Sequence, residues 1–199
     1  MKLHFMGKYD QNPDNLPHSE HFPGAVKYKE PDDLKKFAIL ANVIAFVISA
    51  ILAVFAVIRC LDYFELKDFT SISLGCFVSV LTLFPHELLH AVCFKKDVYF
   101  YTDFAKGIAF VTGTEPMSKG RFILMSLLPN IVFGFLPYII GLIFPNQMFL
   151  ISLGVMATGM GAGDYFNIFN TLTQVPKGAK VYMHKTNTYW YIPQGENDL

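Results

Sequence analysis

The chain has 199 residues, of which 53% are hydrophobic, and its 16 basic and 16 acidic side chains give a formal net charge of zero. This apolar content, with 20 Phe, is more than one soluble domain of this length can bury, so the composition argues against a soluble protein and indicates an integral membrane protein. No cluster of Lys and Arg is dense enough to follow a phosphate backbone, which argues against nucleic acid as a partner.

The first 36 residues are polar and contain four prolines. They lack the apolar core and small-residue cleavage site of a signal peptide, so we expect residues 1–36 to be a polar N-terminal arm. The first apolar stretch after this arm is then expected to direct insertion and to remain in the protein.

Four apolar stretches are long enough to cross the roughly 30 Å hydrocarbon core of a bilayer, which takes about 20 helical residues. They are residues 37–61, 70–94, 122–144 and 148–169. They predict an all-α membrane protein whose domain at residues 37–170 is a bundle of four transmembrane helices. The run Pro31-Asp32-Asp33 is typical of a helix start, and Pro145-Asn146 predicts a turn between the last two helices.

The second stretch contains the run His86-Glu87-Leu88-Leu89-His90. Residues four apart lie on one face of a helix, so His86 and His90 can reach one ion while Glu87 can reach a water molecule beside it. This is the HExxH pattern of zinc metalloproteases: zinc would be the Lewis acid and Glu87 the group that accepts and returns the proton. The pattern also arises by chance, but a carboxylate in apolar surroundings usually marks function.

Residues 97–120, between the second and third stretches, hold two runs of aromatic and β-branched residues, 98–101 and 108–112, separated by Lys106-Gly107. They predict a short β-hairpin near the membrane surface. Its edge strand could hold an extended peptide by main-chain pairing, or the hairpin could only seal the helix ends. Glu115 follows the hairpin and is our second choice for a third zinc ligand.

The last stretch contains one carboxylate, Asp164. Burying its charge in an apolar helix costs free energy unless a cation or a hydrogen-bond donor lies beside it. We predict that Asp164 is the third zinc ligand; a buried hydrogen-bonded Asp is the alternative. The small residues from Gly159 to Gly163 favour close helix packing. Asn130 and Asn167 could orient a ligand or donate to an oxyanion, and bonds between helices are an equal alternative for both.

The positive residues predict the orientation. The N-terminal arm, the loop after residue 94 and the tail at residues 171–199 hold 14 of the 16 Lys and Arg, whereas the segment between the first two stretches holds only Arg59 and Lys67. By the positive-inside rule, both termini and the hairpin are cytoplasmic. Within the tail, residues 180–192 look strand-like.

Several motifs of the chain together resemble those of the small bacterial membrane proteins called putative zincin peptidases. They are the HExxH run followed by Ala91, Pro116 before Lys119-Gly120-Arg121-Phe122, Pro129, and Gly163-Asp164. That family is similar to the site-2 intramembrane metalloproteases. The resemblance implies a bacterial cell membrane protein with His86, His90 and Asp164 as zinc ligands and Glu87 as the catalytic carboxylate. Tyr165 after Asp164 departs from the site-2 pattern, in which Gly follows the Asp.

These patterns favour a membrane zinc peptidase that acts on a peptide or a membrane protein within or beside the cytoplasmic leaflet. Two alternatives stay open: a catalytically silent scaffold that binds a partner helix, and a metal transporter. An intact Glu87 argues against the first, and the scarcity of further intramembrane carboxylates and imidazoles argues against the second.

Overall fold

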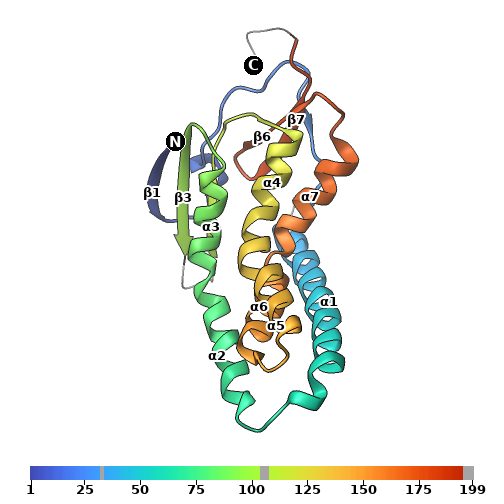
Figure 1. The fold of residues 1–199 in the computed structure, drawn as a ribbon. Coiled ribbons are helices and arrows are strands. Elements are labelled where there is room, and N and C mark those ends of the chain that lie inside the picture. Colours follow the sequence, from blue (N-terminus) through green and yellow to red (C-terminus); the bar gives the residue numbers. More distant parts are fainter. Residues whose placement is uncertain (32–33, 104–107, 195–199) are drawn as a thin grey trace. The chain divides into compact units, whose positions relative to one another are not determined.

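The computed structural model describes residues 1–31, 34–103 and 108–194. It is mostly helical and contains two small β-sheets, one of which includes the expected hairpin (Figure 1). The Asp32-Asp33 part of the predicted helix start and the Lys106-Gly107 turn lie outside the described residues. Contacts divide the chain into two compact units: unit 1 is residues 1–30, 87–126 and 167–199, and unit 2 is residues 31–86 and 127–166. The predicted three-part division, with boundaries after residues 36 and 170, stays a prediction.

The helices within these ranges are α1 (Leu34–Cys60), α2 (Asp68–Leu81), α3 (Leu83–Val92), α4 (Lys119–Pro129), α5 (Leu136–Ile143), α6 (Met148–Met160) and α7 (Ala162–Gln174). Two helical spans, 35–63 and 119–143, are long and apolar enough to cross a bilayer, and the bent pair α2–α3 would make a third. The fourth predicted span is divided at Gly161 into α6 and α7, of which α6 is a shorter apolar helix.

The stretch at residues 70–94, predicted as one transmembrane helix, is divided into α2 and α3, with a bend of 44° between them. Pro85 explains the bend: it has no N–H to donate to the carbonyl of Leu81, and its ring crowds that carbonyl. At the break, the hydroxyl of Thr82 donates to the carbonyl of Ser79 at 2.6 Å. The bend therefore lies directly before the HExxH run.

Proline also shapes the third span. Pro129 ends α4, and the next six residues, Asn130–Phe135, form a wide π-helical segment before α5 begins. Such widened turns are uncommon and occur often at functional sites. Here the widened turn begins at Asn130, one of the predicted site residues.

In unit 2, α6 is the central helix and contacts α1, α2, α5 and the π-helical segment. Glycines permit the close approach: a Cβ on Gly154 would lie 2.5 Å from the backbone nitrogen of Tyr138, and one on Gly159 would lie 2.1 Å from Ser49 Oγ. The predicted close packing at Gly159 is confirmed. Close packing is not found at Gly163, where a Cβ would make only an ordinary contact with Phe37 Cζ at 3.9 Å.

Unit 1 carries both sheets. The strands are β1 (Lys2–Lys8), β2 (Val26–Lys27), β3 (Asp97–Asp103), β4 (Ile108–Thr112), β5 (Met117–Ser118), β6 (Lys180–His184) and β7 (Asn187–Tyr191). The first sheet has the order β1-β3-β4, with β1 parallel to β3 and β4 antiparallel, and the second has the order β2-β7-β6-β5. The predicted hairpin (β3–β4) and the strand-like tail (β6–β7) are confirmed. The arm, predicted to be only polar, contributes strands to both sheets.

Candidate metal centre

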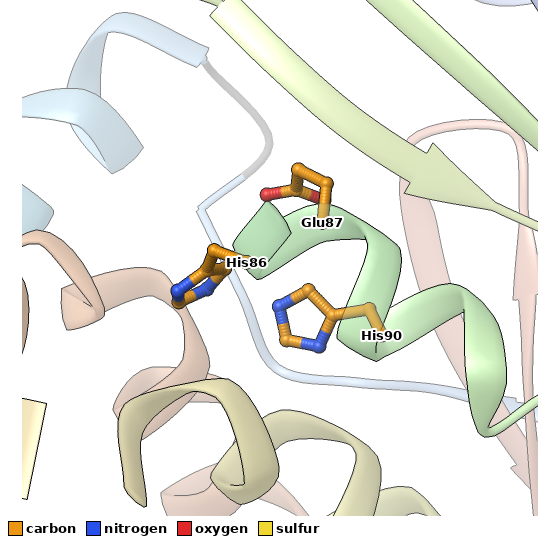
Figure 2. A group of neighbouring side chains, drawn as sticks. All are labelled: His86, Glu87 and His90. Carbon is orange, nitrogen blue, oxygen red and sulfur yellow. The ribbon is translucent and has the colours of Figure 1, made fainter. Parts of the chain in front are cut away.

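The HExxH run lies on one short helix, α3, directly after the bend at Thr82. His86, Glu87 and His90 each offer a ligand atom, and these atoms lie within 4.8 Å of one another. Figure 2 shows the three side chains projecting from this helix. His90 is buried, at 7% exposure, while His86 and Glu87 are half-buried. Spacing along one helix therefore produces the cluster, as predicted.

A backbone contact holds His90. Its Nδ1 lies 2.8 Å from the carbonyl oxygen of Met125, in α4. A carbonyl only accepts hydrogen bonds, so Nδ1 carries the proton and Nε2 has the lone pair of the neutral ring. Metal-ligating imidazoles are commonly held in this way, with the second nitrogen donating to a carbonyl or carboxylate.

Asp164, in the first turn of α7, approaches His86 within unit 2. His86 Nε2 lies 3.0 Å from Asp164 Oδ2, and the two side chains are 12% and 13% exposed. Asn130 Nδ2 donates to the same carboxylate oxygen at 2.8 Å, and Asn130 is 1% exposed. The expected polar partner of Asp164 is thus an imidazole of the HExxH run, and Asn130 orients its carboxylate.

Gly161, between α6 and α7, makes room for Asn130. A Cβ at Gly161 would lie 1.6 Å from Asn130 Oδ1 and 2.6 Å from its Cγ, so the side chain of Asn130 would have to shift. Asn167, the other predicted polar residue, lies further along α7, where its carbonyl accepts from the Thr171 hydroxyl at 2.6 Å. Its predicted role stays a prediction.

Glu87 contacts the hairpin. The backbone N–H of Val111, in β4, donates to Glu87 Oε2 at 3.0 Å. Because β4 is an edge strand of its sheet, the groups that do not face β3 point outward, and this N–H is one of them. The outer edge of β4 therefore borders the carboxylate of the HExxH run.

Comparison with protein families supports this reading of the sequence. The model of the family described as "Putative zincin peptidase" matches residues 79–180, just over half of the chain. The chain belongs to this family. The match includes α3, the β3–β4 hairpin and Asp164. No curated protein and no solved structure matches the chain.

Membership of this zincin family implies zinc, and the side chains fit that ion. Zinc accepts imidazole nitrogen and carboxylate oxygen as ligands, and a catalytic zinc has three protein ligands. The group on α3 supplies two imidazoles, and Asp164 is held against one of them. The described residues contain no other group of three such side chains at this spacing.

The contact between Gly161 and Asn130 gives a first test. We expect Gly161→Ala to weaken zinc binding by roughly 10–100-fold, because the new methyl group displaces Asn130 and with it the carboxylate of Asp164. The matched control is Gly163→Ala, whose Cβ would meet only Phe37 Cζ at 3.9 Å. Zinc affinity of the purified variants is measured by competition with a chromogenic chelator. Equal affinities in the two variants would contradict this role of Asn130.

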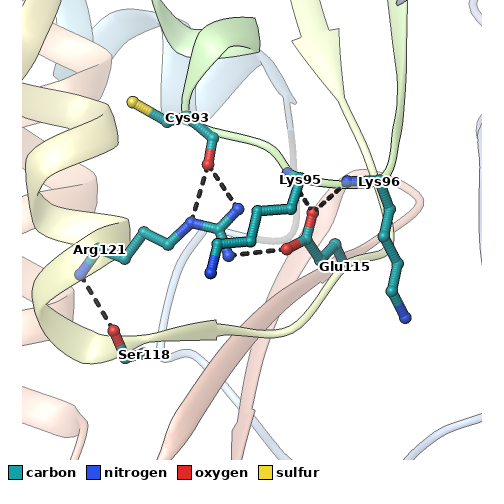
Figure 3. A network of polar contacts seen from close by, with 6 residues as sticks. All are labelled: Cys93, Lys95, Lys96, Glu115, Ser118 and Arg121. Atoms are coloured by element: carbon teal, nitrogen blue, oxygen red, sulfur yellow. Dashed lines mark hydrogen bonds and ion pairs between the residues drawn. The ribbon is translucent and has the colours of Figure 1, made fainter. Parts of the chain in front are cut away.

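Glu115, the alternative third ligand of this zincin, is occupied by another network (Figure 3). Its Oε2 accepts the backbone N–H groups of Lys95 and Lys96 at 2.7 and 2.8 Å, and its Oε1 pairs with Arg121 at 2.7 Å. Arg121 also donates twice to the carbonyl oxygen of Cys93, just after α3. These contacts hold the end of the HExxH helix through Glu115, and no local sequence pattern indicates this role.

Removing this carboxylate is expected to destabilise unit 1. Glu115→Ala removes the acceptor of Arg121 Nη1 and of two backbone N–H groups, while Arg121 keeps its bonds to the Cys93 carbonyl. We expect a loss of about 3 kcal/mol. Glu115→Gln keeps an acceptor but loses the charge and is expected to cost about half as much. Thermal unfolding near neutral pH measures both, with Glu20→Gln, at an exposed site, as the control.

The same network predicts a pH dependence. Burial tends to raise the pKa of Glu115, but Arg121 and the N–H groups of Lys96 and Lys95 outweigh it, and the pKa is lowered. A carboxylate with a lowered pKa in the folded state stabilises the protein fully above its ordinary pKa, about 4.3, and loses this effect as the pH falls through the lowered value. The stability difference between wild type and Glu115→Gln should therefore shrink in acid. A constant difference would contradict the assignment.

Proposed function

We propose that this protein is a membrane-embedded zinc metallopeptidase that hydrolyses peptide bonds within or next to the cytoplasmic leaflet. The observation that carries the proposal is the contact between Asp164 and His86, because it brings a carboxylate from a distant helix against an imidazole of the HExxH run. Neither a chance occurrence of the motif nor a solvated His pair explains a half-buried carboxylate held against His86 and Asn130.

His86, His90 and Asp164 would hold the zinc ion. When bound, zinc supplies a Lewis acid that polarises the peptide carbonyl and lowers the pKa of water towards neutrality. The Met125 carbonyl fixes the tautomer of His90, and Asn130 fixes the orientation of the Asp164 carboxylate. The site thus has its ligands positioned by a second layer of hydrogen bonds, which such sites require.

Glu87 is the proton carrier. Its carboxylate adjoins both imidazoles and accepts a hydrogen bond from the backbone N–H of Val111, which orients it. In hydrolysis Glu87 takes a proton from the attacking water and delivers it to the leaving amine. Asn130, or Asn167 further along α7, would donate to the developing oxyanion.

The outer edge of β4 would hold the substrate. An extended peptide can pair with the main-chain groups of an edge strand, and the position of Val111 puts such a peptide beside Glu87. A helical segment must unwind to pair in this way, because its own hydrogen bonds otherwise occupy its peptide groups. The substrate is thus a peptide or the unwound end of a membrane protein helix.

The membrane setting rests on the apolar helices. The span at residues 35–63 is largely exposed, with Phe46 at 75% and Ile58 at 74%, which suits contact with lipid. We include the bent pair α2–α3 and the pair α6–α7, divided at Gly161, as two further spans, which gives four in all. The distribution of Lys and Arg supports an orientation in which both termini lie on the cytoplasmic side of a bacterial membrane.

Zinc-dependent cleavage by the purified protein tests this proposal. We expect about one zinc per chain in the protein purified into lipid nanodiscs, and cleavage of a membrane-anchored peptide library that stops with a chelator and returns with added zinc. Zinc binding without cleavage of any member would favour the catalytically silent scaffold. Zinc uptake into sealed vesicles would favour a transporter.

A further inference from the structure

Three imidazoles outside the metal centre gather in unit 1 where the N-terminal arm meets the β6–β7 hairpin. His18 and His21 belong to the arm, and His184 is the last residue of β6. The rings of His21 and His184 are stacked, with centroids 4.2 Å apart and planes at 26°. The ring of His18 lies 5.7 Å from that of His184. His184 is thus the centre of the cluster.

Aromatic and hydrogen-bond contacts attach the arm to the hairpin at this place. His21 Nδ1 lies 2.9 Å from the hydroxyl of Tyr182, and its ring centroid lies 4.5 Å from that of Tyr189. One backbone hydrogen bond accompanies them, from the N–H of Lys185 to the carbonyl of Pro17 at 3.3 Å. Phe22 of the arm also stacks on Tyr191, with ring centroids 4.2 Å apart, and packs edge-on against Tyr182. The imidazoles therefore supply one part of the ring contacts that attach the arm.

The surroundings of His184 do not favour a positive charge. Its Nδ1 is buried and has no hydrogen-bond partner. The charged or titratable side chains that act on it are His21, His18 and Lys185, all neutral or positive. Asp14 is bonded to Lys185. If the stacked rings of His21 and His184 both carried a positive charge, they would repel one another.

The electrostatics agree with this geometry. Burial lowers the pKa of His184, as do His21, His18 and Lys185, while the backbone of Ser19 raises it and only partly compensates. A His with a lowered pKa in the attached state binds its proton more readily once detached. Attachment is therefore fully stable above the ordinary His pKa, about 6.5, and is weakened as the pH falls below it.

We propose that His18, His21 and His184 form a proton-operated latch, which holds the arm segment at residues 13–24 on the β6–β7 hairpin near neutral pH and releases it in acid. Imidazole is the side chain suited to such a switch, because its charge changes within the physiological range. Asp14 does not operate the latch, because its hydrogen bond with Lys185 lowers the pKa of its carboxyl and keeps it ionised in mild acid.

Release of the arm segment is expected to change the packing of the first sheet, because the arm also packs against that sheet. Leu16 is 3% exposed and packs in one cluster with Tyr9 and Tyr101, against which Phe110 of β4 also packs. The ring centroids of Tyr9 and Phe110 are 5.3 Å apart. Opening of the latch is therefore expected to loosen the packing beside β4. The latch itself does not depend on the proposed peptidase activity.

The experiment measures the distance between arm and hairpin directly. Spin labels are placed at Glu20 and Thr186, both exposed, in full-length protein in lipid nanodiscs with the native cysteines replaced by Ala. Pulsed electron spin resonance is recorded in a series from about pH 8 to about pH 5.5. We expect one short distance at the alkaline end and a longer, broader distribution at the acid end.

Two variants decide whether imidazole protonation is the cause. His184→Phe keeps an aromatic ring but accepts no proton, so it is expected to retain the short distance at every pH. His21→Phe leaves His184 able to accept a proton but removes the imidazole stacked on it, so this variant is expected to show less release in acid than the wild type. An unchanged distance in the wild type would overturn the proposal, as would acid release in both Phe variants that matches the wild type. Separation of the labels by a chelator at alkaline pH would also overturn it, since the rings would then hold a metal ion.

Discussion

Glu87→Gln is expected to lower the rate of peptide hydrolysis by roughly 10²–10⁴-fold while zinc content stays at the wild-type level. The amide of Gln cannot take the proton from water, but its oxygen can still accept the N–H of Val111, so the edge of β4 keeps its contact with α3. His86 and His90 are untouched. The substitution is therefore expected to remove proton transfer and to leave the proposed metal ligands and the edge of β4 in place.

Initial rates on a membrane-anchored peptide, measured alongside zinc by mass spectrometry, check this expectation. The matched control is Glu20→Gln, the same chemical change at an exposed position in the N-terminal arm. Unchanged hydrolysis in Glu87→Gln would remove Glu87 from the mechanism. Equal losses of zinc and of activity would instead indicate that Glu87 is a zinc ligand.

The sequence predicts local features of this fold better than it predicts pairings between distant segments. Apolar runs locate the helices because helix formation and burial depend on consecutive residues. The bend before α3 was also readable, since Pro85 cannot complete the ladder of hydrogen bonds, but we treated that stretch as continuous. Strand β1 was not readable, because it pairs in parallel with β3, where Lys2 lies opposite Asp97. Nothing near residue 2 indicates that partner.

The same distinction applies to the candidate metal centre. The spacing of His86 and His90 is a property of one helix and could be predicted directly. The approach of Asp164 to His86 followed from the energetic cost of a lone carboxylate in an apolar helix, not from any local pattern. The groups that hold His90 and Glu87, the Met125 carbonyl and the Val111 N–H, belong to the backbone. Every residue carries such groups, so only the folded structure identifies them.

Asp164→Ala is expected to have the largest effect on metal content, with zinc affinity falling by more than about 100-fold. The substitution removes the carboxylate that we assign as third ligand. It also leaves His86 Nε2 and Asn130 Nδ2 without the oxygen that they contact at 3.0 and 2.8 Å, which adds roughly 1–3 kcal/mol of destabilisation. Zinc content after dialysis against a weak chelator, with melting temperature as a check on folding, measures both effects.

The Asp164→Asn variant distinguishes two roles of Asp164: direct binding of the metal, and positioning of His86 only. Asn has the same shape and can still accept a hydrogen bond, but its neutral amide oxygen is a poor zinc ligand. If Asp164 binds the metal, Asn should lose zinc nearly as completely as Ala. If it only orients the imidazole, Asn should lower affinity by about 10–100-fold at most and Ala by more. Asp62→Asn, at an exposed site in unit 2, is the control, and wild-type zinc content in both Asp164 variants would refute the three-ligand site.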